Sequence, residues 1–139
     1  MKLHRLFVSA LAVLALTVPA MADDTPLSEE MEKLSKALKL VNRNLADPSA
    51  KDANLKRIEE AQAALEASHK YEPALAKDVP AAEKAKFMED YKAAMQETKK
   101  TLEELKTAVA ASNTEAAAKV MEKLNTQKKE GHKKFQAEE

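Results

Sequence analysis

The chain has no cysteine, no tryptophan, a single glycine in 139 residues, and aromatic side chains at only 4% of positions. Without cysteine it forms no disulfide, so the fold must be held by packing, or by packing around a bound group. No stretch shows the alternating, β-branched pattern of a strand. The abundance of Ala, Glu, Lys and Leu instead indicates an all-helical protein.

A strong net charge is also missing. The sequence contains 23 basic and 23 acidic residues. Two of the basic residues lie in the first 22 positions, which leaves 21 basic against 23 acidic residues after them, a net charge of −2. No basic segment stands apart from the acidic ones, and we therefore expect no binding to nucleic acid.

Residues 1–22 are typical of a cleaved secretory signal peptide. Charged side chains come first, an apolar run follows at 6–18, and an Ala-Met-Ala cleavage signal ends at Ala22. The apolar run is too short for a transmembrane anchor. We therefore expect residues 23–139 to form one small domain in a bacterial periplasm, with no membrane attachment after cleavage.

Two helices are expected before the longest connection. The first begins at Thr25, with Pro26 at the first helical position, and the Asp47-Pro48 pair ends it and caps the second. The second helix runs to about Tyr71. The apolar residues of the first helix follow steps of four and three, which is the seam of a bundle helix: Leu27, Met31, Leu34, Leu38, Val41 and Leu45.

Two more helices follow the proline-containing connection at 71–80. The third is expected to open near Pro80 with Asp78 as its cap, and Ser112 with Glu115 matches a capping box that begins the fourth. Four amphipathic helices joined by short connections predict an antiparallel up-down-up-down four-helix bundle of the all-α class.

The apolar seam of the fourth helix is interrupted near the C-terminus. Where leucine or valine would be expected, the chain has Gln127, Lys128, Gly131 and His132. Glycine within a helix costs roughly 1 kcal/mol relative to alanine. Either the helix frays at this end, or a group other than protein fills the space beside it.

The predicted topology brings Met31 and His132 to the same end of the bundle at nearly the same height. A thioether and an imidazole on facing helices suit the axial positions of a haem iron. Gly131 would then leave room for a flat macrocycle against the helix.

Two stretches of the sequence carry a family resemblance. The segments LSEEMEKLSKALK at 27–39 and MEKLNTQKKEGHKKF at 121–135 resemble the soluble periplasmic cytochrome b-562 proteins. The resemblance implies a haem b with Met31 and His132 as axial ligands. It also implies a one-electron carrier, rather than an enzyme, that serves an unidentified redox partner protein.

Two further expectations follow from that resemblance. Related c-type bundles attach haem through a C-x-x-C-H motif, and here the corresponding residues 128–132 read KKEGH. The haem would therefore be held without a covalent bond, by ligation and packing alone. We expect the protein to be a monomer.

Other interpretations compete with this one. His69 is four residues after Leu65 and is an alternative ligand, although a cation near a helix C-terminus needs no such role. Glu66 and His69 form one Glu-x-x-His motif, whereas di-iron carboxylate bundles need two. A haem-free exported bundle that acts as a protein-interaction module is the alternative from another functional class.

Overall fold

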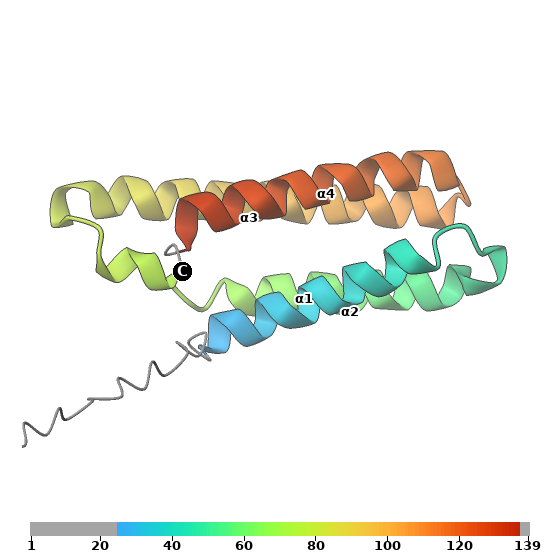
Figure 1. The fold of residues 1–139 in the computed structure, drawn as a ribbon, viewed down its shortest axis with the longest axis horizontal. Helices are drawn as coiled ribbons and strands as arrows, with labels where there is room; N and C mark the ends of the chain where they lie inside the picture. Colours follow the sequence, from blue (N-terminus) through green and yellow to red (C-terminus); the bar gives the residue numbers. More distant parts are fainter. Residues whose placement is uncertain (1–24, 137–139) are drawn as a thin grey trace, which may run out of the picture.

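The computed structural model describes residues 25–136, and its main elements are four α-helices (Figure 1). The expected signal peptide at 1–22 lies outside the described residues. In chain order the helices are α1 (Pro26–Arg43), α2 (Lys51–Ser68), α3 (Ala81–Ala110) and α4 (Thr114–Phe135). Two 3₁₀ turns, η1 (Pro48–Ala50) and η2 (Ala74–Lys77), lie in the connections.

Polar contacts between the helices show that they run antiparallel. Glu59 and Glu66 of α2 pair with Lys106 and Lys99 of α3, so rising numbers in one helix meet falling numbers in the next. The contacts from α3 to α4 follow the same rule, with Thr101 bonded to Gln127 and Glu104 to Lys123. The all-α four-helix bundle expected from the sequence is confirmed.

The four helices are arranged as two hairpins. α1 packs along α2, α3 packs along α4, and α2 joins the hairpins by contacting α3. In the described part of the chain, α1 and α4 are not among the helix pairs that pack closely. Figure 1 shows the two short inter-helix loops at one end of the molecule, and the start of α1 with the end of α4 at the other.

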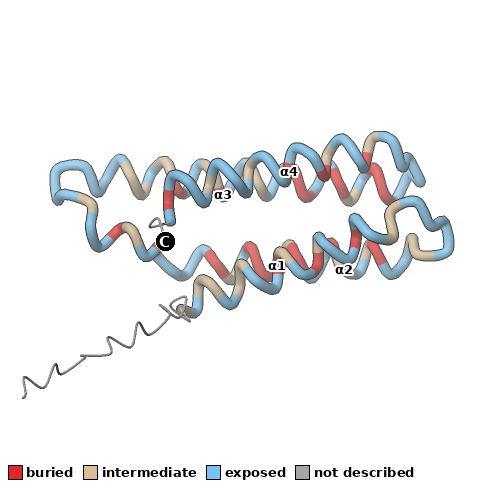
Figure 2. Tube along the Cα trace, in the orientation of Figure 1, coloured by how far each residue is buried: buried red, intermediate tan, exposed pale blue. Residues whose placement is uncertain are grey.

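The buried residues form one continuous core along the facing sides of the helices (Figure 2). Of the six seam positions expected on the first helix, Leu34 and Val41 are buried, and the other four are partly buried and pack against the core. The least exposed large side chains are Val41, Ile58, Leu65, Leu102 and Leu105. Apolar burial contributes about 25 cal/mol per Å², so this cluster accounts for much of the stability of a chain without disulfides.

The sequence predicted only some of the N-terminal caps of the helices correctly. Thr25 caps α1 as expected, and it exchanges hydrogen bonds with Ser28 in a reciprocal capping box. Asp47 caps the 3₁₀ turn η1 rather than α2 itself, through a bond from the Ser49 amide. The expectation that Asp78 caps α3 is wrong: Pro80 occupies the cap position, with no side-chain hydrogen bond to the helix.

The predicted capping box at Ser112 is also wrong. Asn113 caps α4 by accepting a hydrogen bond from the Ala116 amide. Ser112 instead ends α3 in the left-handed conformation, with a φ of 55°. The amides of Ser112 and Asn113 donate to the carbonyls of Val109 and Ala108, which is the Schellman arrangement usually completed by glycine.

Replacing Ser112 with glycine should stabilise the protein. Glycine adopts a positive φ without the steric cost that a side chain carries, so we expect a gain of about 0.5–1 kcal/mol and a Tm raised by about 2–5 °C. Ala111→Gly is the matched control, because Ala111 has a φ of −78° and should lose stability on the same change. Thermal unfolding followed by circular dichroism tests both, and a lower Tm for Ser112→Gly would contradict the argument.

Over residues 25–136, no helix is both long enough and apolar enough to cross a bilayer.

Candidate functional site

Met31 and His132 lie at the same end of the bundle, where α1 begins and α4 ends (Figure 1). Their relative height follows from the polar contacts that set the helix register, namely Asn44 with Asn54, Glu66 with Lys99, and Thr101 with Gln127. Counting along the helices from these contacts at 1.5 Å per residue places Met31 and His132 within about one helical turn of each other. The fold therefore places two residues that are far apart in sequence at one end of the bundle and at similar height, on helices that do not pack closely on each other.

The two residues differ in burial. Met31 is partly buried and packs against the hydrophobic core, whereas His132 is exposed, and so is Lys128 one turn before it. The expectation that Lys128 and His132 continue the buried face of the fourth helix is thus wrong. These positions are polar, and α1 does not pack closely on α4. As a result, no residue of α4 between Leu124 and Phe135 is buried.

The environment of His132 favours its neutral form. Partial burial of the ring, followed by the nearby Lys128 ammonium group, lowers its pKa below the ordinary value. Both effects disfavour a second positive charge on the imidazole. At neutral pH the ring therefore has a free nitrogen lone pair, which is the form that binds metals.

Gly131 is not required by the packing of the described residues. A Cβ atom built at this position would meet no atom within 4 Å outside the local helix. Its φ is not positive, so the backbone conformation does not require glycine either. The side of α4 next to His132 is consequently open where an alanine methyl group would stand.

An aromatic cluster of Phe87, Tyr91 and Phe135 packs α3 against the last turn of α4. The rings of Phe87 and Tyr91 meet that of Phe135 edge-on, with centroids 5.4 and 5.3 Å apart. Beside the cluster, the Lys134 ammonium donates a 3.0 Å hydrogen bond to Asp90. Bonds from Lys134 and Lys86 hold the pKa of Asp90 below its ordinary value, so this link persists at neutral pH.

Tyr91 is a further functional candidate, which the sequence pattern alone does not distinguish from a packing residue. Its side chain is 7% exposed, and its hydroxyl group is buried without a hydrogen-bond partner in the described residues. Burial raises the pKa of the phenol, so the group remains a donor at neutral pH. The feature of the sequence that points to Tyr91 is a tyrosine on the apolar face of a helix, where phenylalanine would pack equally well.

The structure gives little support to the two competing metal sites, which are His69 as an iron ligand and a di-iron carboxylate centre. His69 is an exposed residue at the C-terminal cap of α2, and Glu66 is paired with Lys99 at 3.3 Å. Within residues 25–136 no three His, Cys, Asp or Glu side chains converge to hold a metal ion. A di-iron carboxylate site is therefore not supported by the described part of the chain.

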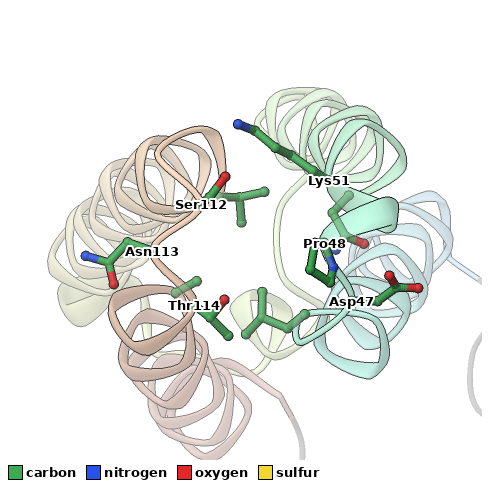
Figure 3. Close-up of a pocket in the computed structure, with 10 residues that line it drawn as sticks. Asp47, Pro48, Lys51, Ser112, Asn113 and Thr114 are labelled. Carbon is green, nitrogen blue, oxygen red and sulfur yellow. The ribbon is translucent and has the colours of Figure 1, made fainter.

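Two hollows in the described surface include neither Met31 nor His132 in their lining. Figure 3 shows one of them between the two inter-helix loops, lined by residues that include Asp47, Lys51 and Asn113. Its volume is about 90 Å³. It lies at the opposite end of the bundle from His132, and it has room for only a few water molecules. The other is a shallow groove on α1 and α2 around Leu40 and Ala63.

Comparison with known families concerns the end of the bundle that carries Met31 and His132. The sequence profile described as cytochrome b562 matches residues 26–136, which is the whole bundle. The chain belongs to the cytochrome b562 family. Members of this family are haem-binding electron-transfer proteins and in general not enzymes. Comparisons with curated proteins and with solved structures returned no match.

The residues at this end of the bundle fit the haem of the cytochrome b562 family. Met31 and His132 supply one thioether and one imidazole, which are ligands of cytochrome haem iron. The open side of α4 at Gly131 gives clearance beside the imidazole. The hydroxyl of Tyr91 is a buried donor that no described residue satisfies.

Proposed function

We propose that this protein is a periplasmic electron carrier that binds one haem b without a covalent bond, with Met31 and His132 as the axial ligands. It acts as a monomer and exchanges single electrons with a redox partner protein that the sequence does not identify. The observation that supports the proposal is the position of these two residues at one end of a bundle of the cytochrome b562 family. Non-covalent attachment is supported by the complete lack of cysteine.

Each residue has a definite part in the proposal. The haem, when bound, supplies the one-electron iron couple. His132 offers a neutral nitrogen because its pKa is lowered. Met31 offers a soft thioether, which binds ferric iron weakly and so favours the reduced state. The periplasmic location is supported by the signal-peptide pattern of residues 1–22.

A spectrum of the protein after addition of hemin tests the proposal. We expect one hemin per chain, and sharp α and β bands after reduction with dithionite, as for six-coordinate low-spin iron. The same titration followed by thermal unfolding should show a higher Tm, because a ligand that binds only the folded chain stabilises it. A protein that binds no hemin would refute the function and leave the haem-free interaction module as the remaining interpretation.

Gly131→Ala should change the free and the haem-loaded protein in opposite directions. In the free protein the new methyl group meets open space and the helix gains up to about 1 kcal/mol. In the loaded protein the methyl group takes up clearance beside His132, so we expect hemin affinity to fall about tenfold or more. Thermal unfolding without hemin and a hemin titration measure the two effects.

Lys129→Ala is the control for this change, since Lys129 is an exposed residue of the same helix. It should alter both quantities little. If Gly131→Ala raises stability without weakening hemin binding, the glycine provides no clearance for the cofactor.

A further inference from the structure

The buried hydroxyl group of Tyr91 needs an explanation. A buried polar group without a partner destabilises a fold, and most such groups in native proteins are satisfied by protein or by ordered water. Phenylalanine would fill the same place without this penalty, as Phe87 and Phe135 do beside it. A buried water would need two or more polar partners, and the ring contacts of Tyr91 with this cluster supply none.

The position of Tyr91 directs its hydroxyl towards the end of the bundle that carries His132. Long side chains on a helix lean towards the N-terminus of that helix, and α3 begins at this end. The ring contact with Phe135, three residues after His132, places the ring of Tyr91 beside the last turn of α4. The hydroxyl therefore lies beside the last turn of α4, at the end of the bundle and beyond the level of His132.

We propose that the Tyr91 hydroxyl donates a hydrogen bond to a propionate of the bound haem and so fixes the orientation of the cofactor in the bundle. This rests on the proposed function. The propionates are the polar groups on the edge of a haem, and both accept hydrogen bonds. The other buried oxygen without a partner in the described residues, Oε1 of Gln127, is an acceptor and would not bind a carboxylate.

Tyr91→Phe separates this role from simple packing. Hydrogen bonds to charged acceptors are stronger than neutral ones, so we expect hemin affinity to fall about tenfold. The free variant should unfold at the same temperature as the free parent or higher, because the unsatisfied hydroxyl is gone. A tyrosine that only packs would instead give equal hemin affinity in both proteins.

Haem dimethyl ester identifies the group that accepts the bond. The ester carries no carboxylate charge, so the difference between Tyr91→Phe and the parent should shrink to about twofold or less. Tyr71→Phe is the matched control: it alters the second of the two tyrosines, which is exposed, and should leave both affinities unchanged.

The remaining outcomes each overturn a distinct statement. Equal hemin affinity in the parent and in Tyr91→Phe overturns the role of Tyr91 and leaves the haem function intact. An equal loss with hemin and with its dimethyl ester overturns the propionate as the acceptor. A parent protein that binds no hemin overturns the proposed function together with this inference.

Discussion

His132→Ala should abolish the six-coordinate spectrum and lower hemin affinity by at least about 100-fold. Loss of a residue that merely supports a metal ligand typically costs 10–100-fold, and loss of the ligand itself removes an iron–nitrogen bond. The free protein should be little affected, within about 0.5 kcal/mol, because the side chain is exposed and no described residue packs it into the core. Hemin titration and thermal unfolding without hemin measure these two quantities.

Two controls make the result decisive. His69→Ala changes an exposed histidine at the same end of the bundle and should leave the spectrum intact. Free imidazole added to loaded His132→Ala should restore the sharp bands, since it supplies the missing donor. If His69→Ala loses the bands and His132→Ala keeps them, the ligand assignment is wrong and His69 is the axial residue.

Met31→Leu should convert the loaded protein to a high-spin spectrum and lower its reduction potential by on the order of 0.1 V. That is a fraction of the roughly 0.8 V over which axial ligands set haem potentials. The thioether stabilises ferrous over ferric iron, so its removal shifts the balance towards the oxidised state. Leucine has a similar volume, and the free protein should lose less than about 1.5 kcal/mol. Redox titration with optical detection gives the potential.

Met88→Leu is the matched control for this change. Met88 is partly buried like Met31 and lies on α3, on the seam that faces the core. Its replacement should leave both the spectrum and the potential unchanged. A shift on Met88→Leu with none on Met31→Leu would refute Met31 as the sixth ligand.

The helices themselves were predictable because their signals are local and repeated. Seam positions such as Leu34, Val41 and Leu102 recur at helical spacing, and burial of those positions needs no knowledge of the other helices. The errors in assigning the helices fell at their ends. The Ser112–Glu115 motif is consistent with a capping box, but the end of α3 required a residue with positive φ at Ser112, which moved the cap to Asn113.

The sequence predicted where Met31 and His132 lie along the bundle and not the environment of either residue. The position of Met31 and His132 at one end could be predicted from the topology and the rise per residue, because four helices joined by short loops must alternate in direction. Their burial depended on which helices pack closely. With α1 paired to α2 and α4 paired to α3, His132 is exposed while Phe135 is buried one turn later.

The sequence by itself determined the all-helical class, the four helices and the absence of cysteine, and it is the source of the proposal that Met31 and His132 are ligands. These depend on composition and on spacing along single helices. Only the tertiary structure showed that Gly131 faces open space and that the hydroxyl of Tyr91 is buried without a partner in the described residues. Both facts are set by atoms distant in the chain, and no pattern within one helix specifies which neighbours a side chain will meet.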